Sequence, residues 1–216
     1  MSFITAIQAI ARKPGRFSIV VDGEVAATLS VDAIERLGLS IGKSIMGLEE
    51  RLAAESAILA VHDRALNMLA FRARSSSELA KGLVRKGEPR DVVDLAITRL
   101  TEQGLLDDSA FAQSFARNKA IGAKQSRRRV QQGLAKKGVP RETSEAAITA
   151  VFEEEGIDQA ELALQAARKK MKSLAKLEPD VRKRRLYGFL ARRGFTPDEI
   201  RAAMKAELHG EADPAE

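Results

Sequence analysis

A glycine preceded by two basic residues recurs three times along the chain. The three stretches are Leu83-Val-Arg-Lys-Gly87, Leu134-Ala-Lys-Lys-Gly138 and Leu190-Ala-Arg-Arg-Gly194, with the glycines 51 and 56 residues apart. A proline follows each glycine by two or three positions, as Pro89, Pro140 and Pro197. Glycine ends a helix in the left-handed conformation without a steric clash, and proline fits the first turn of the next helix. The repeat therefore predicts tandem helical units.

Each unit is expected to contain three helices. Ser75 and Glu78 form a capping-box pattern before the second helix of the first unit. Asp108 and Asp158 can cap the first helices of the second and third units. The expected units are residues 57–104, 105–155 and 156–208. A unit of about fifty residues buries little core alone, so the fold class expected is mainly α, with the repeats stacked in an elongated, curved array.

The N-terminal residues carry strand signals instead. Phe17–Val21 and Glu24–Leu29 are rich in apolar and β-branched side chains, and they flank Asp22-Gly23, a strong hairpin signal. Ile4–Ile10 could add a third strand, and a short helix is expected from Ser30, its N-cap, to Gly38. Residues 1–50 are therefore predicted to form a small β-rich element.

Positive charge is concentrated in the second half of the chain. Residues 108–152 hold 9 basic and 3 acidic side chains, and residues 158–205 hold 13 and 6. Residues 1–56 are nearly neutral, with 6 basic and 7 acidic side chains, and residues 209–216 are expected to form a flexible acidic tail. The second and third units should therefore attract phosphate or an acidic protein surface.

Catalytic patterns are missing from the sequence. The only two histidines, His62 and His209, are far apart, and no Walker loop, HExxH, GxSxG or GxGxxG motif occurs. Asp107-Asp108 is interpreted as a turn and helix cap rather than a metal site. The chain has no cysteine, which excludes disulfides and thiolate metal sites. We expect a protein that is not an enzyme and needs no cofactor or metal.

No apolar run approaches the roughly 18 residues of a membrane span. The first residues lack the basic region and apolar core of a secretory signal. A monomer in the cytoplasm, without membrane contact, is the expectation.

Basic clusters are the candidate binding residues. A charge run is usually a solvated helix face, but Lys124 and Arg127–Arg129 open a helix, where cations oppose the helix dipole. Lys136-Lys137 and Arg192-Arg193 are explained by capping alone, because they lie in last turns. The candidates are Lys124, Arg127, Arg128, Arg129, Arg168, Lys169, Lys170, Lys172, Arg182, Lys183, Arg184 and Arg185.

Stacking platforms for bases are scarce, because Tyr187 is the only tyrosine and the chain has no tryptophan. Contact with phosphate, or with a protein already holding DNA, is favoured over sequence recognition.

Four stretches of the chain form a recognisable set: Arg72-Ala-Arg-Ser-Ser-Ser-Glu-Leu-Ala-Lys81, Gly104-Leu-Leu-Asp-Asp-Ser-Ala-Phe-Ala112, Gln132-Gly-Leu-Ala-Lys-Lys-Gly-Val-Pro140 and Arg184-Arg-Leu-Tyr-Gly-Phe-Leu-Ala-Arg-Arg-Gly-Phe195. Together they resemble the RecX family, regulators of the bacterial RecA recombinase. The resemblance covers about residues 58–204. It implies tandem three-helix repeats without enzymatic activity that bind the RecA filament on single-stranded DNA. Such binding would limit filament extension, ATP hydrolysis and strand exchange, and so modulate DNA repair and the SOS response.

Two other functions remain open from the sequence. Three-helix units also resemble helix-turn-helix domains, so the chain could be an autonomous DNA-binding protein, with single-stranded DNA contacted directly rather than through the filament. An adaptor whose repeats hold an unrelated acidic partner is the other alternative. The sequence does not distinguish capping of filament ends, binding in the filament groove and eviction of subunits.

Overall fold

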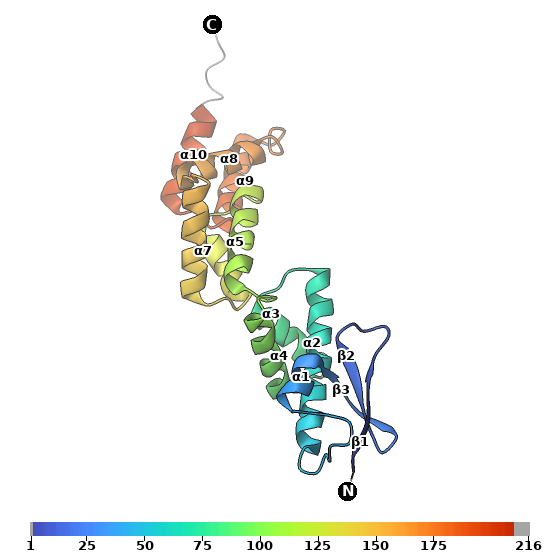
Figure 1. Cartoon of the computed structure of the whole chain (residues 1–216). Helices are drawn as coiled ribbons and strands as arrows, with labels where there is room; N and C mark the ends of the chain where they lie inside the picture. The colour runs from blue at the N-terminus through green and yellow to red at the C-terminus, as the bar shows by residue number, and fades with distance from the viewer. Residues whose placement is uncertain (1, 210–216) are drawn as a thin grey trace. The chain divides into compact units, whose positions relative to one another are not determined.

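The structure is a computed structural model that describes residues 2–209 (Figure 1). The chain divides into two compact units, Met1–Leu106 and Asp107–Glu216. Most of the expected acidic tail, residues 210–216, lies outside the described residues. No helix in the described part is long and apolar enough to cross a membrane.

The first unit begins with a three-stranded antiparallel sheet in the order β1-β2-β3. The strands are β1 (Ile4–Ala9), β2 (Arg16–Val21) and β3 (Glu24–Ser30). Asp22 and Gly23 both have positive φ, 49° and 90°, as the tight turn between β2 and β3 requires. The predicted hairpin and third strand are therefore confirmed.

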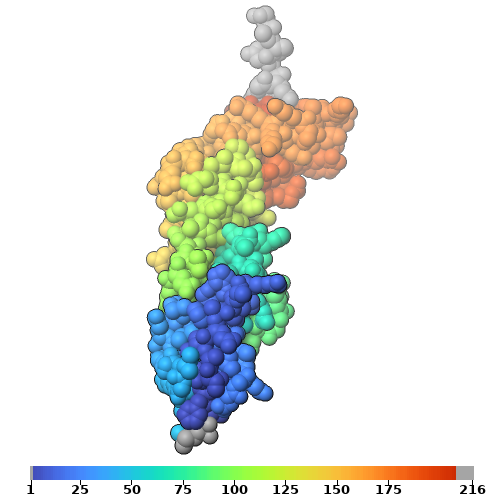
Figure 2. Space-filling view, turned by 45° about the vertical axis from the view of Figure 1, so that its right-hand side comes forward, coloured from blue at the N-terminus to red at the C-terminus, as the bar shows by residue number. Residues whose placement is uncertain are grey.

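A short helix and a loop return the chain to the sheet. Helix α1 (Val31–Arg36) begins where the Ser30 hydroxyl accepts a hydrogen bond from Ala33 N at 3.3 Å, as predicted. The following loop pairs with the start of β1, since Ile4 N donates to the Lys43 carbonyl. Figure 2 shows this segment in lighter blue against the dark blue residues of the sheet.

Helix α2 (Glu49–Phe71) belongs to both the sheet and the first repeat. It begins at Glu49, earlier than the limit at residue 57 that the repeat pattern suggests. Leu52 on its first turns is buried with Ile4, Ile19 and Leu29 of the sheet. Figure 1 shows α2 running beside β3. The first unit therefore holds the sheet and the first repeat together.

The first repeat is completed by α3 (Ser76–Val84) and α4 (Arg90–Glu102). Its core contains Ala65, Leu79, Leu83, Val93 and Leu100, all completely buried. As predicted, Ser75 caps α3, because its hydroxyl accepts from Glu78 N at 3.1 Å.

The second repeat contains α5 (Asp108–Arg117), the π-helical turn η1 (Asn118–Gly122), α6 (Arg127–Lys136) and α7 (Arg141–Glu154). Asp107, not Asp108, caps α5: its carboxylate accepts from Ser109 N at 2.7 Å and from Ala110 N at 3.0 Å. The prediction of Asp108 is wrong because Asp107 has the extended backbone of a cap, whereas Asp108 is already the first helical residue.

The third repeat contains α8 (Gln159–Met171), α9 (Pro179–Arg192) and α10 (Pro197–His209). Asp158 caps α8 as predicted, accepting from Glu161 N at 2.8 Å. Ile157, which precedes that cap, packs against the cores of both the second and the third repeat. Figure 1 shows α5 beside α7 and α8 beside α10. The predicted fold class of three-helix repeats after a small sheet is confirmed.

The recurring glycines end their helices as expected. Gly87, Gly138 and Gly194 have φ of 95°, 73° and 86°. The expected place of the prolines needs correction, because Pro89 and Pro140 occupy the N-cap positions of α4 and α7. At that position the backbone is extended, and proline's fixed φ suits it as well as a first helical turn. Pro197 is the first residue of α10.

Candidate functional site

The twelve basic residues singled out by the sequence all lie in the second unit, but they do not form one cluster. They lie after η1, on the first turn of α6, on the last turn of α8 and on the second turn of α9. The contacts of each group separate structural cations from those that are available to a partner.

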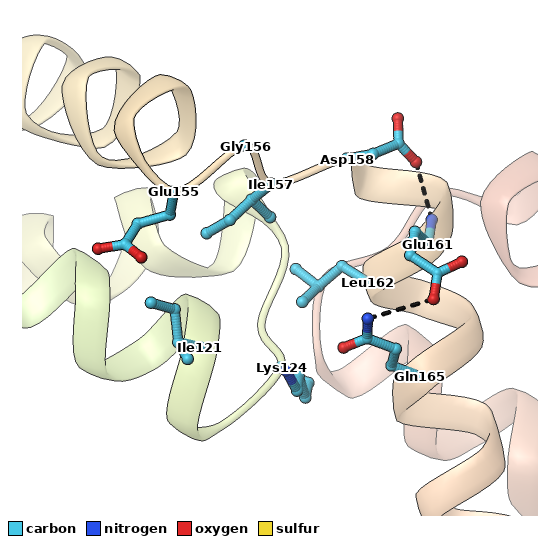
Figure 3. A pocket seen from close by; sticks show the side chains of 9 residues that line it. All are labelled: Ile121, Lys124, Glu155, Gly156, Ile157, Asp158, Glu161, Leu162 and Gln165. Carbon is cyan, nitrogen blue, oxygen red and sulfur yellow. Dashed lines mark hydrogen bonds between the residues drawn. The ribbon is translucent and has the colours of Figure 1, made fainter.

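Lys124 lines a hollow that also contains three carboxylates. This residue follows η1 in a left-handed conformation, with φ of 50°. Figure 3 shows it beside a hollow of about 230 Å³ whose other lining residues include Glu155, Asp158 and Glu161. Each of these carboxylates already has a partner: Arg117 Nε donates to Glu155 at 2.6 Å, Asp158 caps α8, and Gln165 Nε2 donates to Glu161 at 3.2 Å. The positive charge of Lys124 therefore lies beside carboxylates of the protein itself.

Arg127 packs against the protein. Its guanidinium lies 4.8 Å from the centroid of the Phe152 ring, and its backbone N–H donates to Gln159 Oε1 at 3.1 Å. A cation over an aromatic face stabilises the fold by about 0.5–1 kcal/mol. Packing between α6, α7 and α8 thus accounts for Arg127.

Arg128 and Arg129 line a second hollow, of about 280 Å³, together with Arg192 at the end of α9. The remaining lining residues are Gln132, Ala191, Gly194 and Phe195, so the hollow contains no carboxylate. Arg129 Nη1 donates to Gln132 Oε1 at 3.3 Å. Within the described residues, none of the three arginines forms an ion pair. Sequence analysis explained Arg192 by helix capping alone. Its place beside Arg128 and Arg129 follows from the fold, and no local sequence pattern reveals it.

The turn between α9 and α10 rests directly on the start of α6. Ser126, the N-cap of α6, donates its N–H to the Arg193 carbonyl at 3.1 Å. A Cβ at Gly194 would lie 2.6 Å from Ser126 Oγ and 2.7 Å from Arg129 Cβ. We call this contact, formed by Ser126, Arg129, Arg193 and Gly194, the joint between the second and third repeats. It fixes the position of Arg128 and Arg129 relative to Arg192.

Arg193 is part of the packing at the joint. Its guanidinium lies 4.5 Å from the Phe189 ring centroid, and burial lowers the pKa of this side chain. Its buried Nη1 has no hydrogen-bond acceptor in the described part of the chain. Unlike Arg192, it is held within the protein.

The cluster at the end of α8 has structural contacts. Arg168 pairs with Glu207 at 3.4 Å, and Lys170 Nζ lies 5.5 Å from the Phe189 ring centroid. Lys169 and Lys172 are exposed at the C-terminal end of the helix. The helix dipole favours cations there, so the fold itself explains this cluster in part.

The cluster on α9 is the most open one. Lys183, Arg184 and Arg185 are exposed and, in residues 2–209, form no ion pair, whereas Arg182 is partly buried. They lie on the second turn of α9, away from the end where the dipole would favour cations. Tyr187, 43% exposed, lies on the next turn. Helix stability does not account for these residues.

His62 is a core residue of the first unit. It is 8% exposed, and its Nε2 lies 3.0 Å from Gln103 Oε1, to which it is hydrogen-bonded. Among residues 2–209, no group of three or more His, Cys, Asp or Glu side chains could hold a metal ion.

Comparison with known proteins gives matches over all three repeats. The family models described as the first, second and third three-helix domains of RecX match residues 62–100, 107–148 and 157–204. "Regulatory protein RecX" of Chlorobaculum tepidum is 37% identical over 150 residues, which are 69% of this chain and 89% of that protein. "Regulatory protein RecX" of Clostridium botulinum is 27% identical over 98% of this chain and 99% of its own length.

Two solved structures support the fold. "Crystal structure of regulatory protein RecX" is similar with a TM-score of 0.76 and 23% identity, covering 95% of this chain and all of that one. "Crystal structure of RecX from Lactobacillus salivarius" has a TM-score of 0.56 and 21% identity over 69% of this chain and 96% of that one.

Proposed function

Because this chain belongs to the RecX family, we propose that it regulates a RecA recombinase, mainly as an inhibitor. It binds the filament that the recombinase forms on single-stranded DNA and limits its extension, ATP hydrolysis and strand exchange. This places it in DNA repair in the cytoplasm. The observation that carries the proposal is the match of all three repeats, in order, to the three RecX domains.

The charge of the second unit supports the proposal. A recombinase filament offers phosphates and acidic protein side chains, and a positive surface speeds encounter with either. Exposed Arg128 and half-buried Arg129 on α6 and the exposed Lys183 to Arg185 on α9 have no ion pair in residues 2–209 and are the main contacts. The remaining candidates, Lys124, Arg127, Arg182 and the α8 cluster, add to the field but are more involved in local contacts.

The test is ATP hydrolysis by a bacterial RecA on saturating single-stranded DNA, titrated with this protein. We expect inhibition at ratios well below one molecule per recombinase, since a regulator that stops extension acts on many subunits at once. An unchanged rate up to equimolar protein would contradict the proposal. Varying the amount of DNA separates regulation from competition, because a competitor for DNA loses its effect when DNA is in excess.

An autonomous DNA-binding protein is the second candidate, favoured by the carboxylate-free hollow lined by Arg128, Arg129 and Arg192. It predicts tight binding to naked duplex, with a log-log salt slope of about 0.9 per neutralised phosphate. Weak binding to naked duplex beside strong binding to the filament would dismiss it.

A further inference from the structure

Three arginines line one small hollow, and no negative charge in that hollow neutralises them. Arg128 and Arg129 come from α6, Arg192 comes from α9, and no carboxylate lines the hollow. Like charges held close together repel one another, and an anion between them would remove that repulsion. Guanidinium groups present planar sets of N–H donors that match oxyanions. The hollow therefore has the chemistry of an oxyanion site.

Gly188 allows Arg192 to lie along α9. A Cβ at Gly188 would come within 3.3 Å of Arg192 Nη1, so the guanidinium folds back over the glycine, one turn before its own Cα. Glycine inside a helix is unfavourable, and here it leaves the space that Arg192 occupies. The positive charge of the hollow thus extends along α9 toward its second turn.

Tyr187 lies next to this surface. It is one helical turn before Ala191, which lines the hollow, and one position before Gly188, over which the Arg192 guanidinium folds. In the described part of the second unit it is the only exposed aromatic side chain. An aromatic ring beside a basic groove is the combination that grips single-stranded nucleic acids, whose bases are free to stack.

We propose that the hollow of Arg128, Arg129 and Arg192 binds a backbone phosphate of single-stranded DNA and that Tyr187 stacks on an adjacent base. Donors that reach the hollow from two helices suit a tetrahedral phosphate better than a planar carboxylate, and a stacking ring adds nothing to the binding of an acidic protein. The inference deepens the proposed function by identifying a direct contact with the strand, and it rests on that function only for its cellular setting.

The experiment uses the full chain and a short oligo(dT), compared with an abasic strand of the same length. Tyr187 is the only tyrosine and there is no tryptophan, so intrinsic fluorescence reports on this one ring. Oligo(dT) should quench it at saturation, whereas the abasic strand should bind without quenching. Free N-acetyltyrosinamide mixed with the same strand corrects for light absorbed by the bases.

Two variants separate the phosphate contact from the stacking contact. Arg192→Gln should weaken oligo(dT) binding about tenfold and reduce the log-log salt slope by about 0.7, the value for one phosphate on a single strand. Arg201→Gln, which removes the same charge from an arginine paired with Asp198, is the control and should change neither. Tyr187→Leu should lose roughly fivefold or more in affinity for oligo(dT) and none for the abasic strand.

Unquenched Tyr187 at saturation, or equal losses for Arg192→Gln and Arg201→Gln, would overturn the inference. Competition by poly-glutamate as effective as that by oligo(dT) would also overturn it, in favour of an acidic protein partner. If strand binding is independent of Arg192 and Tyr187 while RecA inhibition persists, this inference fails and the proposed function stands.

Discussion

At the scale of single residues, a side chain at Gly194 would be both strained in its backbone and in conflict with the start of α6. Its φ is 86°, and an added Cβ would lie 2.6 Å from Ser126 Oγ and 3.1 Å from the backbone N of Arg129. Gly87, the matching glycine of the first repeat, has φ of 95° but meets nothing within 4 Å. Alanine at Gly87 should cost about 1–2 kcal/mol of left-handed strain. Alanine at Gly194 should cost about 1–3 kcal/mol more from overlap at the joint.

Urea unfolding of Gly87→Ala and Gly194→Ala measures the two losses in free energy of unfolding. Because the two variants share the backbone strain, the difference between them isolates the contact at the joint. Equal losses would show that the turn between α9 and α10 moves away from α6 without cost.

Local signals explain which residue roles were predictable. Ser30, Ser75 and Asp158 cap helices through atoms within three residues of themselves, so sequence was sufficient. Asp107 and Asp108 offer the same chemistry one position apart, and only the backbone conformation distinguishes them. Arg192 gains its neighbours from α6, more than sixty positions earlier, and no local pattern encodes that contact.

At the scale of elements, the second helix of each of the first two repeats carries an interior glycine at the same position. A Cβ at Gly133 would lie 2.8 Å from the Phe115 ring, and a Cβ at Gly82 would lie 2.7 Å from Met68 Cε. The Phe115 ring stacks on Phe111 at 6.2 Å, whereas the end of a methionine side chain moves easily.

Gly133→Ala should therefore lower the free energy of unfolding by on the order of 1 kcal/mol, because overlap with Phe115 exceeds the gain in helix propensity. Gly82→Ala should be neutral or stabilising by up to about 1 kcal/mol, since Met68 can give way. Thermal unfolding of both variants checks this. A destabilised Gly82→Ala together with an unaffected Gly133→Ala would contradict this prediction, because it would mean that Met68 is held more rigidly than Phe115.

Glu55 on α2 connects three helices of the first unit. Its ion pairs make the stability of that unit sensitive to acid. Arg99 Nη2 on α4 donates to Glu55 at 2.9 Å, and Arg36 on α1 pairs with it at 2.8 Å. Burial opposes ionisation, but the hydrogen bonds and charges of Arg99 and Arg36 outweigh it and lower the pKa of Glu55.

A carboxyl whose pKa is lowered by folding contributes stability above the pKa of the unfolded chain, about 4.3 for Glu, and that stability is lost as the pH falls through the folded value. The wild-type chain should lose this contribution in that acid range. Glu55→Gln should lack it already at neutral pH and lose less stability on acidification. Unfolding of both proteins across this pH range gives the measurement, and parallel pH profiles would contradict it.

The sheet shows what element-level patterns can and cannot predict. Its strands and hairpin follow from β-branched residues around Asp22-Gly23, which act locally. The repeat pattern predicts the first unit from residue 57, whereas α2 begins at Glu49, because Leu52 packs under the sheet and Glu55 binds Arg36 of α1. Those two residues attach α2 to the sheet and to α1, which are not part of the repeat, so the repeat pattern does not include them.

At the scale of the whole molecule, the two units differ in net charge. Residues 1–56 are nearly neutral, whereas residues 108–152 and 158–205 carry a large excess of cations. The sequence alone predicts this difference in net charge, because charged residues can be counted in each segment without knowledge of the fold. Composition does not show which cations are available to a partner. Arg127 over Phe152 and Arg168 beside Glu207 each add one positive charge, just as the exposed Lys183 does.

Two pairs of exposed cations provide a matched test of that ranking. Lys169→Gln with Lys172→Gln and Lys183→Gln with Arg184→Gln each remove two positive charges from a chain of net charge +6. The α8 pair lies where the helix dipole favours cations, so its loss should lower the free energy of unfolding by about 0.5–1 kcal/mol. The α9 pair has no such role, and its loss should change stability by less than about 0.5 kcal/mol.

The α9 variant should inhibit RecA ATP hydrolysis less than the α8 variant, because only the α9 pair lies within one helical turn of Tyr187. Both variants are titrated against the same filament at several salt concentrations. Long-range attraction depends on net charge and is screened by salt, so it should weaken equally in the two variants. A difference between them that persists at high salt therefore measures direct contact through α9. Identical curves would mean that inhibition depends on the positive field of the second unit and not on direct contact through α9.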